Sequence, residues 1–162
     1  MRPGRALLTL GILGSLGCGG PPQWVGAPPE AHLGESFYPW RAATLGIDPA
    51  AARARDESLP DGDSVPSDDV LGPEMAGEAS ALWAQLCAQC HGRDGAPVVH
   101  TPKTPRDWTG MGVRMGFFFG GDKMRAAIYR RIRDGVPPGM PAWKNTLSRE
   151  QIWALVRHVE GF

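Results

Sequence analysis

The chain has 162 residues, enough for one ordinary domain and an additional segment, and 42% of them are hydrophobic, as in a globular protein. Its 22 glycines and 16 prolines indicate that a compact domain is joined to a loosely structured segment. Three cysteines are too few for a framework of disulfides. The formal net charge of zero combines an acidic stretch over 19–74 with a basic stretch over 75–162, which are expected to have different partners or to bind each other.

Residues 1–18 have the pattern of an export signal. Two arginines precede an apolar stretch over 6–16, which is too short to span a bilayer because a spanning helix needs about 20 residues. Cys18 follows, and the arrangement resembles a bacterial lipoprotein signal, in which this cysteine is lipidated and becomes the mature N-terminus; Ser15 stands where that family usually has Leu. We therefore expect an exported chain on the periplasmic side, anchored to the membrane through Cys18. The alternative is an ordinary cleaved signal and a soluble periplasmic protein.

Residues 19–74 are predicted to form a disordered tether. Pro, Gly, Ala and acidic residues dominate this stretch, and no sustained periodicity indicates a helix or a strand. Residues 34–47 are the exception, because Phe37, Tyr38 and Trp40 are unfavourable in water. This piece is expected either to dock on the domain or on a partner, or to form a local hydrophobic clasp within the tether.

Residues 75–162 are predicted to form a small all-α domain. The first helix covers 75–87, where apolar residues recur at intervals of three and four. The second covers 122–134 and ends before a glycine that is suited to a helix stop. The third begins at Ser148, where Gln151 completes a capping box. No alternating run indicates a strand.

The segment Cys87-Ala88-Gln89-Cys90-His91 is the C-x-x-C-H signature of covalent haem attachment. Two thiols three residues apart at a helix end reach the two vinyl groups on one porphyrin edge, and the adjacent imidazole can then bind the iron. We predict one haem c attached through Cys87 and Cys90, with His91 as an iron ligand. A thioredoxin-like pair lacks its β-α-β surroundings, and a zinc site lacks further ligands at suitable spacing.

Met140 is the predicted second axial ligand of the iron. It lies in the stretch GVPPGMPAW, over 135–143, where prolines on both sides stiffen the loop. A thioether ligand favours ferrous iron and so raises the reduction potential. His100 is the other candidate, and an open or water-bound iron is the third possibility.

Residues 75–162 resemble the class I cytochrome c family, particularly the small bacterial single-haem domains. Four segments occur in the family's order: CAQCHGRDG, then PRDWT at 105–109, then IYRRIRDGVPPGMPAW, and finally LSREQIWALVRHV. The resemblance implies three to four helices around one covalently attached haem. It also implies that the first and last helices cross, with Ala79 and Trp83 at the crossing.

The resemblance suggests roles for residues near the haem. In this family a proline carbonyl holds the proximal histidine; Pro97 is our choice here, and Pro102 is the alternative. Trp143 is expected to contact a haem propionate or to serve as a core aromatic. The stretch VRMGFFFGGD departs from the family pattern, and its phenylalanines 117–119 either line the haem pocket or form an exposed docking patch.

The predicted function is one-electron transfer between exported or membrane-bound redox partners. No paired carboxylates, nucleophile constellation or phosphate loop indicates an enzyme, and no nucleic-acid partner is expected. Four arginines within 125–133 favour acidic docking surfaces on the partners, unless they only form a solvated helix face. One alternative is a haem-based sensor or gas-binding domain with an open or labile sixth site. Another is a docked haem subunit of a respiratory complex.

Overall fold

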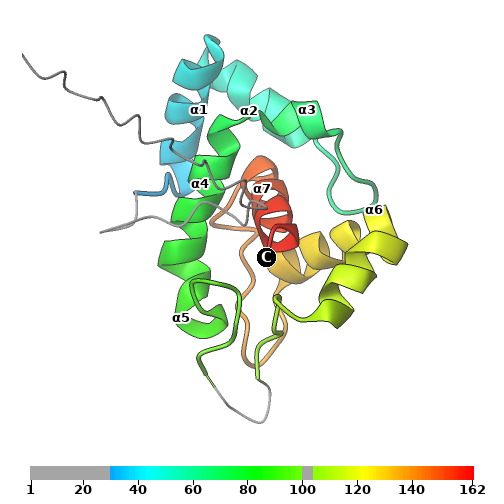
Figure 1. The fold of residues 1–162 in the computed structure, drawn as a ribbon. Helices are drawn as coiled ribbons and strands as arrows, with labels where there is room; N and C mark the ends of the chain where they lie inside the picture. The colour runs from blue at the N-terminus through cyan, green and yellow to red at the C-terminus, as the bar shows by residue number, and fades with distance from the viewer. Residues whose placement is uncertain (1–29, 100–103) are drawn as a thin grey trace, which may run out of the picture.

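The computed structural model describes residues 30–99 and 104–162, and over these residues it is helical, with one isolated β-bridge between Val136 and Met140 (Figure 1). The all-α prediction is therefore confirmed. None of the helices in this described part is long and apolar enough to cross a membrane. The predicted signal, Cys18, His100 and Pro102 lie outside the described residues.

Short connections join most of the helices, and longer loops precede α3, α6 and α7. In chain order the helical elements are a 3-10 turn (Gly34–Ser36), α1 (Phe37–Leu45), α2 (Pro49–Ser58), α3 (Asp68–Leu71), α4 (Glu74–Leu82), a π-helical turn (Trp83–Cys87), α5 (Ala88–His91), α6 (Met111–Asp134) and α7 (Arg149–Glu160).

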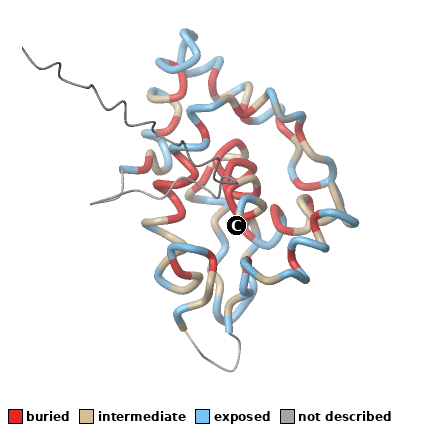
Figure 2. The backbone as a smooth tube through the Cα atoms, in the orientation of Figure 1, coloured by how far each residue is buried: buried red, intermediate tan, exposed pale blue. Residues whose placement is uncertain are grey.

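Helix α7 forms the centre of the core. It begins with the predicted capping box, because the Ser148 hydroxyl accepts from the Gln151 N–H at 3.1 Å and the Gln151 side chain accepts from the Ser148 N–H at 3.0 Å. Every residue over 150–159 except Arg157 is buried (Figure 2). A helix that is buried on all sides needs neighbours all round, and α2, α3, α4 and α6 supply them.

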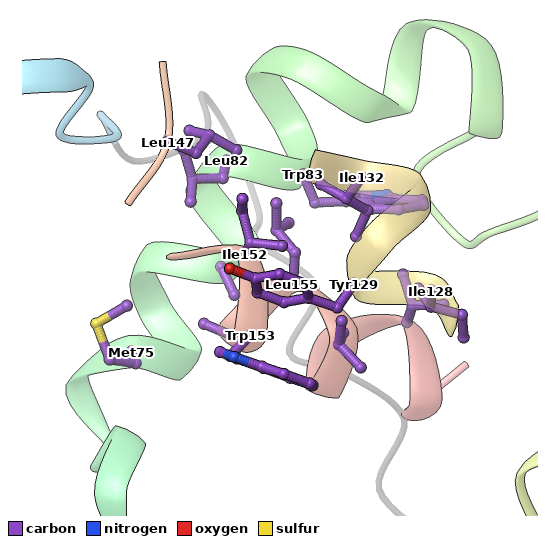
Figure 3. Close-up of a cluster of buried hydrophobic side chains, with 14 of the residues drawn as sticks. Met75, Leu82, Trp83, Ile128, Tyr129, Ile132, Leu147, Ile152, Trp153 and Leu155 are labelled. Atoms are coloured by element: carbon purple, nitrogen blue, oxygen red, sulfur yellow. The ribbon is translucent and has the colours of Figure 1, made fainter. Parts of the chain in front are cut away.

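Helices α4 and α7 pack against each other, as the resemblance implied. Ala79 and Trp83, the residues predicted for this crossing, are both almost completely buried. The Trp83 ring lies 5.6 Å from the His158 ring and 4.9 Å from the Phe162 ring, measured between centroids. Figure 3 shows the adjoining cluster, in which buried side chains from α4, α6 and α7 meet.

The prediction of a tether over 19–74 is wrong for residues 30–73. These residues form a folded segment that packs on the domain, which we call the extension. Helix α2 starts with ordinary N-terminal signals: Asp48 accepts from the Ala51 N–H at 2.9 Å, and Pro49 is at the first helical position. Residues 34–47, which were expected to dock on the domain or on a partner, dock on the domain and bury Phe37 completely. The Pro- and Gly-rich composition misled the prediction, since the extension is held by contacts with distant residues rather than by a core of its own.

A buried ion pair joins the extension to α7. The Arg41 guanidinium donates to the Glu150 carboxylate at 2.6 Å, and both side chains are almost inaccessible to water. Arg41 also donates to the main-chain oxygen of Leu71 at 2.9 Å, and the Glu150 N–H donates to Asp56 at 2.7 Å. Burial raises the pKa of the Glu150 carboxyl, and Arg41 opposes this shift. The extension thus supplies both the partner of a buried carboxylate and a cap for the first turn of α7.

The loop between α2 and α3 reaches α6 (Figure 1). Tyr129 donates to Asp61 at 3.0 Å, and Arg133 forms an ion pair with the same carboxylate at 3.1 Å. The Trp153 indole of α7 donates to the main-chain oxygen of Pro60 at 2.8 Å. Here the acidic and the basic stretches of the chain bind each other, which was one of the two outcomes expected from their charges.

The start of the extension is fixed at the junction of α4 and α7. The Gln151 amide donates to the main-chain oxygen of His32 at 2.6 Å and to Glu78 at 2.8 Å. The His32 N–H in turn donates to Glu78 at 2.9 Å, and its ring stacks on Trp40 with centroids 4.6 Å apart. The chain therefore joins the folded body within the first few described residues.

Candidate haem site

The C-x-x-C-H segment lies at the end of a continuous helical run. Helix α4 passes into the π-helical turn, and α5 follows and ends at His91, with Gly92 in a left-handed conformation at φ 74°. A π-helical turn inside a longer helix is frequently found at a functional site. Cys87 and Cys90 form no disulfide with a described residue and are half-buried, and burial raises the pKa of the Cys87 thiol to about 12.

The His91 ring is half-buried and held from the loop before α6. The Trp108 indole nitrogen lies 3.2 Å from His91 Nδ1, and because an indole can only donate, Nδ1 accepts. Burial lowers the pKa of His91, and a main-chain hydrogen bond with Arg106 opposes this shift. Trp83 packs nearby, with ring centroids 5.7 Å apart. These contacts hold the ring in place; Nε2 can bind iron only in the tautomer that carries the proton on Nδ1, in which that nitrogen donates instead of accepting.

The contact predicted for Pro97 is not seen in the described part of the chain. The His91 ring bonds to Trp108 and Arg106, whereas Pro97 is half-buried and its neighbour Val98 donates to the main-chain oxygen of Cys90 at 3.1 Å. Both partners belong to the PRDWT stretch, which the family resemblance had singled out without assigning it a role. The PRDWT stretch was therefore the sequence signal for the partners of His91, although Arg106 and Trp108 make the contacts and Pro105 does not.

Met140 lies in a loop whose backbone is fixed at two points. The Val136 N–H donates to the Met140 oxygen at 2.9 Å, and the Met140 N–H donates to the Val136 oxygen at 3.0 Å. Gly135 has φ 73°, and a Cβ at this position would lie 2.6 Å from the Met140 oxygen. Only glycine fits there, because a side chain would meet both backbone strain and a steric clash.

Comparison with known proteins identifies the family. The family described as cytochrome C oxidase, cbb3-type, subunit III matches residues 74–159, more than half of the chain. The chain belongs to this family of cytochrome c domains. A search of the curated proteins and a search of the solved structures found no match. As a cytochrome c domain, the chain carries covalently bound haem c with its iron, and it is a haem-based electron carrier that works with redox partners.

The residues of this cytochrome suit such a group. Partly buried apolar side chains lie at the edge of the core on three separate segments: Leu86 and Cys87 before α5, Met124 on α6, and Met140 and Trp143 in the loop that follows α6. Two cysteines and an imidazole accompany them, which are the two attachment points and one iron ligand that a covalently attached haem requires. No group of three or more His, Cys, Asp or Glu side chains suited to a metal ion occurs among the described residues, so the zinc alternative lacks ligands there.

Trp143 of the cytochrome is half-buried and packs against the core. Its main-chain N–H donates to the main-chain oxygens of Ile132 at 3.2 Å and Arg133 at 3.1 Å, which ties the loop back to the end of α6. This position agrees with the role of a core aromatic. Contact with a propionate stays a prediction.

The phenylalanine run lies in a part of α6 that the sequence did not predict. Gly121, with φ 45° and ψ −125°, divides α6 into a first arm over 111–120 and a second arm over 122–134. The second arm is the helix that was predicted, and it ends at a C-cap glycine as expected. In the first arm, Phe117 is buried, whereas Phe118 and Phe119 are exposed.

Most arginines of the second arm of α6 bind other parts of this chain. Arg125 pairs with Glu160 and with Asp122, the latter at 2.9 Å. Arg130 donates to the main-chain oxygen of Gly62, and Arg133 pairs with the extension. The predicted acidic partner therefore has fewer arginines available here than the sequence indicated.

Proposed function

We propose that this cytochrome shuttles single electrons between exported or membrane-bound redox partners, with His91 and Met140 as the two axial ligands. One observation carries the proposal: the two candidate ligands lie on separate segments, each fixed by its own main-chain and side-chain bonds. Trp108 and Arg106 hold the His91 ring, and the paired bonds with Val136 hold the Met140 backbone. Bound haem supplies the one-electron iron couple.

The individual residues have distinct tasks in this proposal. Cys87 and Cys90 provide the attachment thiols, and the helical run that carries them sets the position of His91. The thioether of Met140 favours ferrous iron and excludes other ligands. A loop held by a paired backbone contact and an obligatory glycine is better suited to a permanent ligand than to one that must leave. The arrangement thus favours a carrier over a sensor.

The visible spectrum of the haem-loaded full chain tests this ligand set. Ferric wild type is expected to show the weak far-red band of iron bound to methionine sulfur, and its ferrous form is expected not to bind carbon monoxide at neutral pH. Met140→Ala is expected to lose the band and to bind carbon monoxide. Met124→Ala is the matched control, since Met124 is also partly buried at the core edge. A high-spin wild type, or an unchanged Met140→Ala spectrum, would favour the sensor.

We further propose that the chain is exported and lipidated at Cys18, which would anchor it on the periplasmic side of the membrane. The support is the sequence of residues 1–18. Labelling of cells with a radioactive fatty acid is expected to mark the wild type and not Cys18→Ser. Recovery of unlabelled wild type from the soluble periplasmic fraction would indicate an ordinary cleaved signal instead.

A further inference from the structure

The first arm of α6 carries an exposed row of large apolar side chains, which we call the apolar stripe: Met111, Met115, Phe118 and Phe119. Their exposed fractions are 79%, 47%, 80% and 75%. The spacing of four, three and one residues places all four on one side of a helix. Val113 and Phe117, on the opposite side, are the buried residues that hold this arm on the domain.

Such a row is unusual, because the solvent side of a surface helix is normally polar. The stripe supplies half of the large exposed hydrophobic residues in the described part of the chain; the others are Leu45, Ile47, Val98 and Val136. Within the stripe, the Phe118 and Phe119 rings pack edge to face with centroids 5.0 Å apart. Contiguous exposed apolar patches mark interaction sites.

The stripe adjoins the part of the molecule that holds His91. Trp108, which bonds to His91, lies just before Gly110, the N-cap of the first arm. From the arm itself, Arg114 donates to the main-chain oxygen of Phe162 at 2.9 Å. Phe162 packs on Trp83, and Trp83 packs near His91. A protein bound at the stripe would therefore lie next to the segment that holds His91.

The extension leaves this side open. It covers the N-terminal end of α7 and bonds to the second arm of α6 through Asp61 and Gly62. These surfaces are already covered by the extension. A partner could reach them only by removing the extension, which would expose buried groups such as Arg41. The first arm, by contrast, projects its apolar side into solvent.

We propose that the apolar stripe is the docking surface for a redox protein that exchanges electrons with this cytochrome, and that this partner presents an apolar patch bordered by acidic side chains. The proposal rests on the proposed electron-carrier function. Arg114 on the first arm and Lys123 just after the Gly121 break are exposed and complement acidic groups. One electron passes between the partner and the haem iron, so that one is oxidised as the other is reduced.

The size of the stripe also indicates a transient partner. Four such side chains offer roughly 500 Å² of surface, or about 1,000 Å² counted on both proteins. This area is below that of a typical stable dimer and matches the brief encounters of redox proteins. A second copy of this chain is therefore not the expected occupant.

The test measures electron transfer in cells of the native host in which the wild-type gene is replaced by a variant. Visible absorbance of the haem is used to measure two rates: reduction after the cells receive a respiratory electron donor, and reoxidation after an oxygen pulse. Phe118→Gln/Phe119→Gln is expected to slow at least one of these rates about tenfold, equivalent to about 1.4 kcal/mol. Leu45→Gln/Ile47→Gln, an exposed apolar pair on and just after α1, is expected to leave both rates unchanged. Lys123→Glu is expected to slow the same rate, and to do so less at high salt.

Several results would overturn the proposal. Equal rates for the stripe variant and the wild type would show that partners dock elsewhere. A shifted spectrum or reduction potential of the purified stripe variant would place the phenylalanines against the haem. Stripe-dependent binding to phosphatidylglycerol vesicles would assign the stripe to a lipid surface, and stripe-dependent dimers in sedimentation would assign it to a second copy. A wild-type haem that neither reduces nor reoxidises in cells would instead refute the electron-carrier function itself.

Discussion

His158 offers a sharp test of how the crossing of α4 and α7 is stabilised. Its ring is 9% exposed and packs against Trp83 and Phe162, with centroid distances of 5.6 Å and 5.1 Å. Its Nε2 atom is buried and has no hydrogen-bond partner in the described part of the structure. Burial lowers the pKa of His158 to about 4. The folded protein therefore holds this ring neutral.

The lowered pKa predicts a loss of stability in acid. In the unfolded chain the ring takes up its proton near pH 6.5, whereas in the folded chain it does so only near pH 4. Between these values the unfolded state binds more protons, so the free energy of unfolding falls as the pH falls. At 1.36 kcal/mol for each pKa unit, the total loss from His158 is about 3 kcal/mol, and it is complete near pH 4.

His158→Phe keeps an aromatic ring at the crossing and removes both the titration and the unpaired nitrogen. We expect the variant to exceed the wild type in stability by about 1 kcal/mol at pH 7. The difference should widen by about 3 kcal/mol as the pH falls to 4. Urea unfolding of the haem-loaded protein at several pH values, followed by circular dichroism, measures both quantities. His158→Gln should share the flatter pH dependence without the gain at pH 7, and parallel curves for wild type and His158→Phe would refute the reasoning.

Three further predictions concern the extension and the ligand loop. Arg41→Met should lower the free energy of unfolding by about 3–5 kcal/mol because it leaves the buried Glu150 carboxylate with only Arg55, at 4.0 Å, as a cationic partner, and adding Glu150→Leu should restore most of that loss in urea unfolding. If the double variant is no better than the single one, the ion pair is not the cause. Trp153→Phe removes a buried hydrogen bond to the extension and should cost about 1 kcal/mol in the same assay; an unchanged midpoint would contradict this. Gly135→Ala should displace the Met140 loop and weaken the far-red ferric band, and a band of wild-type strength would show that the loop tolerates a Cβ.

The parts of the fold that the sequence predicted well are those with local causes. The capping box at Ser148 needs only residues three apart, and the stop at Gly135 needs only a left-handed position. The extension has causes of another kind. Arg41 meets Glu150 from 109 residues away, and Tyr129 meets Asp61 from 68 residues away. Composition and periodicity cannot show such pairs, so a polar, proline-rich stretch of this kind predicts a tether even where it folds.

The candidate site divides in the same way. Cys87, Cys90 and His91 form a contiguous motif, and their placement at a helix end follows from the apolar periodicity before them. The bond between Trp108 and His91 depends on a loop that folds back over 17 positions without any repeating pattern. For the phenylalanine run, the sequence left two outcomes open, because the exposure of each ring depends on which side of the first arm faces the domain.

The early docking of the chain at His32 has a consequence for how the cytochrome would search for partners. With the proposed lipid at Cys18, the chain from the anchor through Glu30, where the described chain begins, has 12 residues (19–30), whereas a tether through residue 74 would have had 56 (19–74). At about 3.3–3.6 Å for each extended residue, the maximal reach falls from about 190 Å to about 40 Å. Because the effective concentration of a partner within reach scales roughly as the −3/2 power of tether length, it rises about tenfold. Such a cytochrome would exchange electrons with proteins close to its anchor on the membrane rather than with distant complexes.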